Sequence, residues 1–351
     1  MLSAGNGFIM QSVKYSRDNA GQSLKKYILL KQGELAYNHG ASKAKQFGCC
    51  YELTEPEARI PYVYHCFKVS DTEYTPFVAA TLNNPKMDKQ LKRLVSSSVR
   101  MDGLLNISFD DYMSVSLHLP SFAEQKKIAD FLKKLDERIT AQEMLVASLK
   151  KYKRGVVSAI LSHRIVFSDA DGKPYPEWTS CTLQDAVVFL DGQRKPLESA
   201  DRARRQGKYP YYGASGIIDY IDDYIFDEPL LLLGEDGANI INRSTPLCFI
   251  ATGKYWVNNH AHVMRPQNGH NIKFLCELLE SLDYTRYNTG TAQPKLNQEK
   301  CRGIELNLPI YEEQCRIADF LSSLDQKAER EQANLDCLLL FKRGLMQQLF
   351  I

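Results

Sequence analysis

The stretch from Leu119 to Leu161 decides the fold of this chain: LPSFAEQKKIADFLKKLDERITAQEMLVASLKKYKRGVVSAIL. A second version, LPIYEEQCRIADFLSSLDQKAEREQANLDCLLLFKRGLMQQLF, runs from Leu308 to Phe350 near the end of the chain. The two copies lie 189 residues apart throughout and align without an insertion. A repeat of this length in a constant register indicates that the chain contains two copies of one unit, each a variable domain followed by this segment.

Both copies have the pattern of a long helix. Apolar residues recur in alternating steps of three and four from Ile128 to Ile160, and again from Ile317 to Leu349. This is the a/d pattern of a coiled coil, and each copy starts directly after Leu-Pro, which suits a helix start. Four polar residues interrupt this pattern, at equivalent positions of the two copies: Gln142, Lys153, Glu331 and Lys342. About 40 residues of helix would extend roughly 60 Å.

Two equivalent helices in one chain can pair antiparallel with approximate two-fold symmetry; the alternative is that each helix only packs on its own domain. A pseudo-symmetric pair would present two like surfaces, which predicts two copies of one partner. We expect helix pairing and partner docking to involve the same positions in both copies. These are Glu124, Gln125, Ile128, Phe131, Leu132, Leu135, Glu313, Gln314, Ile317, Phe320, Leu321 and Leu324.

The composition is that of a globular protein and restricts the possible sites. The 351 residues are 44% hydrophobic and 25% charged, with a formal net charge of +2. Bulk charge therefore neither requires nor excludes nucleic acid, so any phosphate-binding surface must come from local clustering. The nine cysteines are scattered without a CxxC motif, which fits a reducing cytosol. The sequence shows no signal peptide and no apolar run near 18 residues, so we expect a cytoplasmic protein.

The first variable domain is expected over residues 1–118. The sequence predicts strands over Tyr27–Leu30, Tyr62–Val69 and Phe77–Thr81, a helix over Lys86–Leu94, and a last strand near Met113–Leu117. Five basic residues and one acidic residue lie between positions 86 and 100, which is either a solvated helix face or a phosphate-binding one.

The second variable domain is expected over residues 164–307, with the long helices at 119–163 and 308–351. Predicted strands cover Leu230–Leu233, Leu247–Ala251, Ala261–Met264 and Gly303–Leu308, and a predicted helix covers Ile272–Leu282. Six basic and two acidic residues between positions 194 and 208 precede the sequence YPYYGASG. This stretch is either a surface turn with partly packed tyrosines or a surface that contacts phosphates and sugars.

Motifs of common enzymes are missing from the sequence. It contains no GxGxxG, no GxxxxGK[ST] and no Asn/Asp-Pro-Pro-aromatic tetrapeptide of an amino-methyltransferase. His260 and His262 have the spacing of one strand face, but no third metal ligand is evident. We therefore expect a chain that is not itself an enzyme, with no metal site.

The paired segments make the chain similar to a known family. It resembles, over essentially its whole length, the DNA-specificity (S) subunit of type I restriction-modification systems. The sequences that carry this resemblance are LPSFAEQKKIADFLKKLDERI and LPIYEEQCRIADFLSSLDQKA, each followed by KRG, with YPYYGASGIIDY, LLLLGEDGANI, VNNHAHVM and TGTAQPKLN in the second half, and ILLKQGELAYNHG and GLLNISFDDYM in the first.

The resemblance implies a fold class: α+β, with two mixed target-recognition domains joined by two long helices that form an antiparallel coiled coil. Each domain would read half of a split site on double-stranded DNA, and two methyltransferase subunits would dock on the helices, with two ATP-driven restriction subunits joining for cleavage. S-adenosylmethionine, ATP and Mg would belong to those partners, and this chain would hold no cofactor. One departure is that residues 1–118 lack a segment like Pro176–Gly192, so we expect a shortened first domain.

Candidate DNA contacts follow from the usual division between phosphate and base readout. We selected polar and basic residues on the helix of the first domain and the loop that follows it, and on Gly-containing loops of the second. They are Lys92, Arg93, Ser97, Ser98, Arg100, Lys208, Tyr211, Tyr212, Ser215, Arg243, Thr291, Gln293 and Lys295. The alternative function is a symmetric scaffold that joins two identical proteins without binding DNA.

Overall fold

The computed structural model of this chain describes residues 2–3, 7–10, 27–40, 42, 45–95, 105–290 and 293–350. It divides into two compact units, each described by itself: unit 1 comprises Met1–Met144 with Gln332–Ile351, and unit 2 comprises Leu145–Glu331. Two long helices, α5 (Phe122–Leu161) and α11 (Tyr311–Leu349), each give one part to unit 1 and the other to unit 2. In the described part of the chain, no helix is long and apolar enough to cross a membrane.

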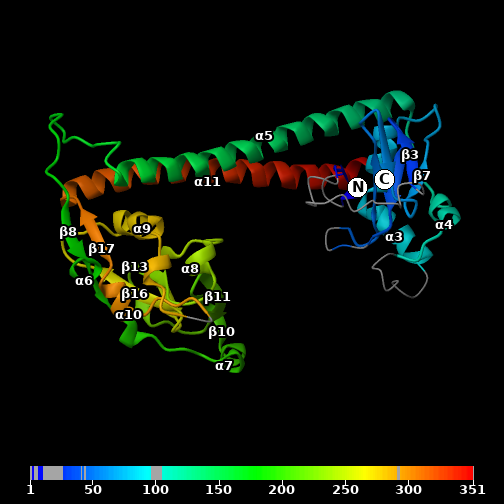
Figure 1. Cartoon of the computed structure of the whole chain (residues 1–351). Coiled ribbons are helices and arrows are strands. Elements are labelled where there is room, and N and C mark those ends of the chain that lie inside the picture. Colours follow the sequence, from blue (N-terminus) through cyan, green and yellow to red (C-terminus); the bar gives the residue numbers. More distant parts are fainter. Residues whose placement is uncertain are drawn as a thin grey trace. The chain divides into compact units, whose positions relative to one another are not determined.

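Unit 1 is built on short antiparallel strands covered by helices (Figure 1). One sheet has the order β5-β4-β7, and the pairs β3–β6 and β1–β2 complete the strands. The strands are β1 (Leu2–Ser3), β2 (Gly7–Phe8), β3 (Ile28–Lys31), β4 (Leu35–Asn38), β5 (Cys49–Glu52), β6 (Glu57–Ile60) and β7 (His65–Phe67). Three short helices follow them: α2 (Thr75–Leu82), α3 (Pro85–Leu94) and α4 (Phe109–Met113).

Unit 2 has two four-stranded sheets, in the orders β14-β13-β16-β9 and β11-β10-β15-β12, and a pair β17–β8. Its strands are β8 (Thr179–Thr182), β9 (Val187–Phe189), β10 (Gln206–Gly213), β11 (Gly216–Ile221), β12 (Phe226–Asp227), β13 (Leu230–Gly234), β14 (Cys248–Ala251), β15 (Lys254–Val257), β16 (Ala261–Pro266) and β17 (Glu305–Leu308). Its short helices are α6 (Leu183–Ala186), η2 (Asp191–Gln193), α7 (Ser199–Arg204), α8 (Asn239–Asn242), α9 (Ile272–Ser281), η3 (Thr285–Tyr287) and α10 (Gln298–Arg302).

The strand registers show that the sheet cores of the two units have the same strand arrangement. In unit 1, Tyr37 of β4 pairs with His65 of β7, as Leu233 of β13 pairs with His262 of β16 in unit 2. The strand pair β3–β6 of unit 1 likewise corresponds to the pair β12–β15 of unit 2, and the strands of both pairs run antiparallel. The elements from β3 to α2 therefore correspond to those from β12 to α9.

The repeated Ile-Ala-Asp-Phe-Leu sequence has the same packing role in both units. In unit 1, Phe77 of α2 lies in one buried cluster with Ala129 and Leu132 of α5. In unit 2, Phe274 of α9 lies in the core with Ala318 and Leu321 of α11. Burying a Leu or Phe side chain contributes about 1.5–3 kcal/mol, so these contacts fix each sheet-covering helix on a long helix.

The two long helices pair antiparallel within each unit (Figure 1). In unit 1, Leu135 and Ile139 of α5 pack with α11 residues between Leu335 and Leu345. Further toward the start of α5, Leu132 packs with residues at the far end of α11, so the two helices run in opposite directions. This arrangement confirms the predicted fold class of mixed α/β domains with two long helices in contact.

An ion pair repeats this symmetry at equivalent positions. In unit 2, Lys153 of α5 binds Asp325 of α11, with Nζ to Oδ1 at 2.7 Å. In unit 1, Lys342 of α11 binds Asp136 of α5. The two lysines are equivalent in the repeat, as are the two aspartates, so the lysines that interrupt the apolar pattern are explained by these pairs.

Two predicted strands of the first domain were wrong. Residues 77–81 belong to helix α2, because Phe77 and its neighbours bury an apolar face between the sheet and α5 rather than alternating across a strand. The predicted strand near Met113–Leu117 is absent, because Met113 ends helix α4 and residues 114–117 form no strand. Their counterparts in unit 2 lead into β17, which pairs with β8. In unit 1 the Gln90 side chain of α3 instead donates to Ser116 O at 2.9 Å and accepts from Ser116 N at 3.0 Å. A helix side chain thus takes the hydrogen bonds that a neighbouring strand provides in unit 2.

Candidate functional site

Four segments that are distant in the sequence meet on one surface of unit 2, named here the loop surface. It is formed by Ala214–Gly216, Gly234–Gly237, Asn258–His260 and Gln293–Lys295. Backbone hydrogen bonds join them: Glu235 N donates to His260 O at 2.8 Å, Gly237 N to Pro294 O at 3.0 Å, and Asn258 N to Tyr212 O at 3.0 Å. The four motifs of the second half noted in the sequence therefore come together.

Glycine is required where two of these segments approach most closely. A Cβ atom on Gly234 would lie 2.7 Å from Ala214 O, which is too short for any real contact. The end of β13 and the hairpin between β10 and β11 can touch only because this side chain is missing.

A buried polar network fixes the loop surface from below. His262 is fully buried, and its Nδ1 lies 2.7 Å from an Asp191 carboxylate oxygen while its Nε2 lies 2.8 Å from Leu296 O. Asp191 also accepts from Val263 N and from Gln298 Nε2, both at 2.8 Å. Burial alone would raise the pKa of Asp191, but these hydrogen bonds and the nearby Arg194 lower it. The ionised carboxylate is therefore favoured, and through His262 it holds Leu296, at the end of the Gln293–Lys295 segment.

A second ion pair extends this network. Arg194 Nη1 lies 2.8 Å from a Glu235 carboxylate oxygen and donates to Ala261 O at 2.8 Å. The side chains of both residues are less than 15% exposed, so the pair is largely screened from solvent. The backbone of Glu235 accepts from Leu296 N at 2.8 Å. Asp191, Arg194, Glu235 and His262 together hold three loop segments in one geometry, which is the requirement for precise recognition.

Some predicted DNA contacts of the second domain lie on or near this surface. Ser215 and Gln293 are exposed on two of its segments, and the half-exposed Lys295 has its Nζ 3.5 Å from Glu235. Lys208 is exposed on β10 with its Nζ over the ring of Tyr209. These positions are compatible with contacts to phosphates and bases, and they stay predictions.

Others of that set have structural roles instead. Tyr211 is 1% exposed, and its hydroxyl accepts from Leu197 N at 2.9 Å, so it belongs to the core. Tyr212 is half-buried against Phe249 and Tyr255. Arg243 is tied to Glu280 by an ion pair of 2.8 Å. Tyr211 is buried because alternate positions of β10 face inward, which removes it from the predicted contacts. Arg243 caps the end of α8 and is engaged by Glu280, and its DNA contact stays a prediction. Thr291 lies outside the described residues.

Asp191, Arg194, Glu235 and the exposed Asn259 were not predicted from the sequence. His260 and His262 were considered only as metal ligands, and the Nδ1 atom of His260 lies 2.7 Å from Asp236. The two histidines bind different carboxylates, and the described residues hold no group of three potential metal ligands. The sequences GED and NNHAH carry Glu235, Asn259, His260 and His262, so the dense polar character of both motifs was the available signal for these residues. Asp191 and Arg194 lie in a separate segment, DGQR, which gave no such signal.

Unit 1 repeats the frame of this surface with other side chains. Leu105 N donates to His39 O at 2.9 Å, as Leu296 N donates to Glu235 O. His65, the counterpart of His262, has its Nε2 3.1 Å from Ile107 O, and His39 Nδ1 lies 2.9 Å from Leu105 O. In the described part of unit 1, neither histidine has an acidic partner like Asp191. Burial lowers the pKa of His65, which favours its neutral form.

The predicted contacts of the first domain are only partly described. Lys92 and Arg93 are exposed on α3, whereas Ser97, Ser98 and Arg100 lie outside the described residues. The basic side chains belong to α3, whose Gln90 binds Ser116. The His39 frame is formed by other elements of unit 1. DNA contact by these lysine and arginine side chains stays a prediction.

Most of the residues predicted for pairing and docking are buried. Ile317 and Leu321 lie in the core of unit 2 with Leu324 packed against it, and Leu132 and Leu135 are buried in unit 1 beside the half-buried Ile128. Phe131 and Phe320 are exposed by 47% and 37%, and Glu124 is exposed. Glu313, by contrast, is buried, which raises the pKa of its carboxyl.

The repeated glutamines are internal and not docking residues. Gln125 accepts from Tyr74 N at 2.9 Å and donates to Pro120 O at 2.8 Å. Gln314 does the same with Asn271 N at 2.9 Å and Pro309 O at 2.9 Å. Tyr74 and Asn271 are the N-cap residues of α2 and α9, so each glutamine joins the start of a long helix to the start of the helix that covers the sheet.

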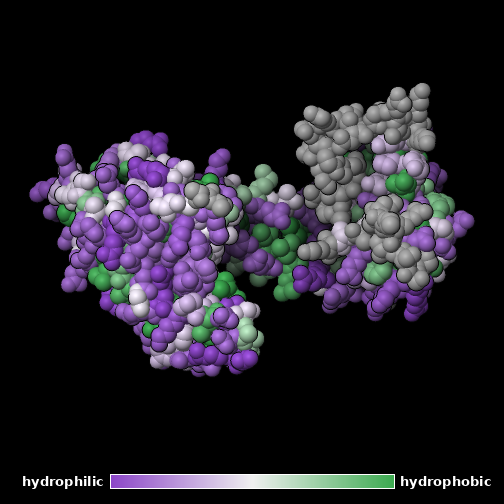
Figure 2. Space-filling view, turned by 60° about the horizontal axis from the view of Figure 1, so that its bottom comes forward, coloured by the Kyte–Doolittle hydropathy of each residue, from purple (hydrophilic) through white to green (hydrophobic). Residues whose placement is uncertain are grey.

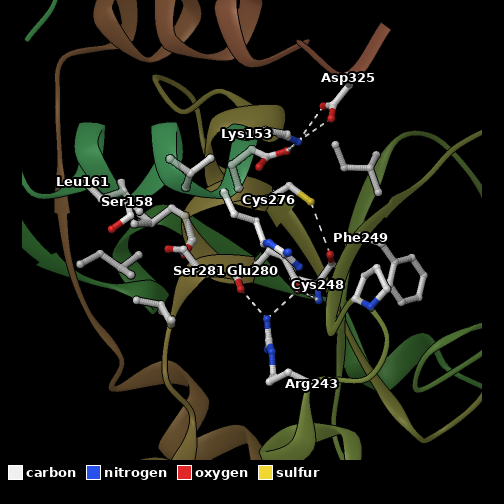
Figure 3. Close-up of a pocket in the computed structure, with 18 of the residues that line it drawn as sticks. Lys153, Ser158, Leu161, Arg243, Cys248, Phe249, Cys276, Glu280, Ser281 and Asp325 are labelled. Atoms are coloured by element: carbon white, nitrogen blue, oxygen red, sulfur yellow. Dashed lines mark hydrogen bonds and ion pairs between the residues drawn. The ribbon is translucent and has the colours of Figure 1, made fainter. Parts of the chain in front are cut away.

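Unit 2 also contains a wide hollow of about 1240 Å³ between α5, α9, β17 and α11 (Figure 3). Its charged side chains are largely paired with each other: Lys153 binds Glu277 at 2.6 Å and Asp325, and Arg243 binds Glu280. Cys276 points across the hollow and donates to Cys248 O. This pairing leaves no nucleophile beside a base among the labelled residues, so the hollow does not have the arrangement of an active site.

Comparisons with known proteins agree with the fold. A family model described as the type I restriction modification DNA specificity domain matches residues 175–337. A putative type I restriction enzyme specificity subunit of Haemophilus influenzae is 32% identical over 149 residues, which cover 42% of this chain and 37% of that protein. The type I restriction enzyme EcoprrI specificity subunit of Escherichia coli is 30% identical over 145 residues, which cover 41% and 35%.

A solved structure extends the likeness in fold to most of the chain. The S subunit of a type I restriction-modification system from M. genitalium has a TM-score of 0.57 at 16% identity, covering 93% of this chain and 85% of that one. At this identity the match shows the fold alone.

The matched family model and the curated relatives agree on the class, which is that of type I restriction-modification proteins. Within that class, residues 175–337 match the DNA specificity domain, and the chain is similar to specificity (S) subunits, the family that its repeated segments resemble. The aligned part spans only 35–37% of these two curated relatives' length.

Proposed function

We propose that this chain is the DNA-reading subunit of a type I restriction-modification complex and performs no chemistry itself. Unit 2 would read one half of a split site on double-stranded DNA through the loop surface, and unit 1 would read the other half through the His39 frame. The observation that supports this most is the convergence of four loops on a buried network, Asp191–His262 and Arg194–Glu235. Rigid polar loops of this kind suit base-edge recognition.

The partners of this chain are part of the same proposal. Two adenine methyltransferase subunits would dock on the long helices, and restriction subunits would join them. S-adenosylmethionine, ATP and Mg would be bound by those subunits rather than by this chain. Two dockings are supported by the repeated contacts of the long helices, because equivalent surfaces in the two units fit equivalent partners.

The test is methylation mapping with the methyltransferase subunit of the same system. Co-expression with the wild-type chain should produce methyladenine at one bipartite sequence. A Ser215→Ala, Gln293→Ala variant should relax or abolish recognition of one half-site and leave the other half unchanged, with each lost base contact worth about 1–3 kcal/mol. Unchanged recognition of both halves would remove the loop surface from the proposal, and absence of any DNA footprint with the partner bound would favour a scaffold instead.

A further inference from the structure

The loop surface of unit 2 carries an exposed histidine whose ring is held by a carboxylate. His260 Nδ1 lies 2.7 Å from an Asp236 carboxylate oxygen, and the His260 side chain is 50% exposed. The backbone of the same residue is fixed on both sides, because His260 N donates to Asn258 Oδ1 and His260 O accepts from Glu235 N, both at 2.8 Å. Among the described residues, His260 Nε2 has no hydrogen-bond partner. The ring therefore has a fixed orientation and one nitrogen free for a ligand outside the chain.

The frame of the loop surface does not require this pair, because unit 1 forms the same frame without it. By the strand registers of the two units, Gly40 and Val63 of unit 1 stand at the positions of Asp236 and His260. These two residues offer neither a carboxylate nor an imidazole. Exposed ion pairs also contribute little to stability, so the fold gives no reason for the pair in unit 2. A side-chain pair that the frame does not need is available for recognition.

The carboxylate of Asp236 would repel DNA unless a cation neutralised it. In the ranges that the structure describes, Asp236 forms an ion pair only with His260, whereas Glu235 is neutralised by Arg194 at 2.8 Å. The Asp236 side chain is 23% exposed, so phosphates at the loop surface would add to its negative charge. In such a complex both charges favour the protonated form of His260. A protonated imidazole donates from both nitrogens, from Nδ1 to Asp236 and from Nε2 to the DNA.

The other charged groups on the segments around His260 have partners of their own. Lys295 Nζ lies 3.5 Å from Glu235, and Arg194 Nη1 lies 2.8 Å from the same carboxylate group. His262, two residues further along the chain, is fully buried and does not reach the surface. Among the described residues of the loop surface, His260 is therefore the histidine whose charge can respond to DNA.

The face of unit 2 in Figure 2 is mainly hydrophilic, with only small hydrophobic areas, which suits a polar ligand. We propose that His260, positioned by Asp236, takes up a proton when DNA binds and donates a hydrogen bond from Nε2 to an acceptor of the DNA, either a purine N7 or a phosphate oxygen. The proposal rests on the proposed function and names one contact within it. The contact belongs to the half-site read by unit 2, since Gly40 and Val63 allow no counterpart in unit 1.

The test measures DNA affinity against pH at constant ionic strength. It uses the full-length chain, the methyltransferase subunit of the same system, and a duplex with the bipartite sequence found by methylation mapping. The wild-type affinity should rise as the pH falls from about 8 to about 6, by at most about ten-fold per pH unit for one proton. His260→Gln keeps a donor that does not titrate, so its affinity should stay constant over this range.

A variant of the positioning residue separates charge from geometry. Asp236→Asn keeps an acceptor for His260 Nδ1 but removes the negative charge that favours the protonated ring. Its pH profile should therefore shift to lower pH, which a merely structural role of Asp236 would not cause. The matched control is His118→Gln, which alters an exposed histidine of unit 1 outside the loop surface and should keep the wild-type profile.

Modified duplexes identify the acceptor atom. His260→Phe should weaken binding at about pH 6 by at least about ten-fold. Within the half-site of unit 2, 7-deazapurines remove single N7 atoms and methylphosphonates remove single phosphate charges. The modification at the contact should weaken binding by the wild type and have no further effect on His260→Phe. Coupling to a 7-deazapurine would show a base contact, and coupling to a methylphosphonate a phosphate contact.

The outcomes separate this contact from the proposed function. A wild-type affinity that is independent of pH, or a pH dependence that persists in His260→Gln, would overturn the proton-linked contact and leave the proposed function intact. Equal effects of every modified duplex on the wild type and on His260→Phe would do the same. Loss of DNA binding by His260→Phe together with faster hydrogen exchange at Gly234–Gly237 would assign the ring a structural role and also overturn the contact. No binding of the duplex by the wild-type chain with its partner would contradict the proposed function itself.

Discussion

The ion pairs of the long helices predict an asymmetry that can be measured. Lys153 binds two carboxylates, Glu277 at 2.6 Å and Asp325 at 2.7 Å, and its side chain is 20% exposed. Lys342 binds only Asp136 among the described residues, with the two side chains 34% and 52% exposed. The same substitution to methionine, which keeps the apolar stem, should therefore have unequal effects on the two units.

The expected magnitudes follow from exposure and from the number of partners. Hydrogen bonds to charged groups contribute about 1.5–3 kcal/mol when shielded, and Lys153→Met also leaves Glu277 and Asp325 facing each other without a cation. We expect Lys153→Met to lower the stability of unit 2 by about 2–3 kcal/mol. Lys342→Met removes a more solvated pair and should cost unit 1 less than about 1 kcal/mol.

Peptide-resolved hydrogen exchange is the suitable assay, because it reports the opening free energy of each unit in the intact chain. Burial alone would lower the pKa of Lys153, but its hydrogen bonds to Asp325 and Glu277 raise it above the usual 10.5. A raised lysine pKa gives stability that is fully present below 10.5 and is lost as the pH rises through the folded-state value. The difference between wild type and Lys153→Met should thus be constant from pH 6 to 9.

The double variant Lys153→Met, Glu277→Gln is the control for carboxylate repulsion and should recover part of the loss. Equal effects of Lys153→Met and Lys342→Met on their own units would refute the reasoning, because burial and partner number would then not determine the contribution of these lysines.

Three further predictions concern the polar contacts. Asp191→Asn removes the charged acceptor of buried His262. It should lower the opening free energy of Gly234–Gly237 and Gln293–Leu296 by about 1–3 kcal/mol, seen as faster hydrogen exchange, while unit 1 is unchanged. Because the folded-state pKa of Asp191 is lowered, its contribution to the stability of unit 2 is present above the usual pKa of 3.8 and is lost as the pH falls through the folded-state pKa. Acid titrations of the wild type and of Asp191→Asn should show this loss of stability, below about pH 4, only in the wild type. Gln314→Leu and Gln125→Leu each leave the backbone N–H of an N-cap residue without its acceptor. Gln314→Leu should lower the stability of unit 2, and Gln125→Leu that of unit 1, by about 1–2 kcal/mol each. Thermal unfolding, with hydrogen exchange at the starts of α9 and α2, measures these losses.

The long helices could be predicted from sequence because their information is periodic and repeated. The steps of three and four place Leu132, Leu135 and Ile139 on one face, and the constant register of the copies indicates equal roles. The roles of polar residues in the repeat could not be assigned, because Gln125 and Lys153 have partners from far away in the chain. Tyr74 is 51 residues from Gln125, and Glu277 is 124 residues from Lys153.

The site was harder to predict for the same reason. Gly-rich polar motifs marked the segments that form the loop surface, but not which of their side chains face outward. Tyr211 looked like a contact residue because it stands beside basic residues, and it is buried because its strand alternates. Asp191 attracted no attention in the sequence, since a single aspartate after a short strand is common, and only the fold brings it to His262.

The two units are alike in some places and different in others, and the distribution has a physical meaning. Where the long helices meet the sheet-covering helices, the same residue types make the same contacts in both units, such as Gln125 and Gln314 or Lys342 and Lys153. Beneath the loops, unit 2 uses Asp191 with His262, while unit 1 uses His39 and His65 on the same backbone frame.

Selection on two surfaces that bind one kind of partner keeps their chemistry equal, whereas two surfaces that read different ligands are free to diverge. The likeness of the helices therefore supports two equal dockings, and the difference under the loops supports two different half-sites. Altering Asp191 tests the second half of this argument. Because Asp191 lies beneath the loops of unit 2, Asp191→Asn should disturb the order of these loops and leave the contacts of the long helices unchanged.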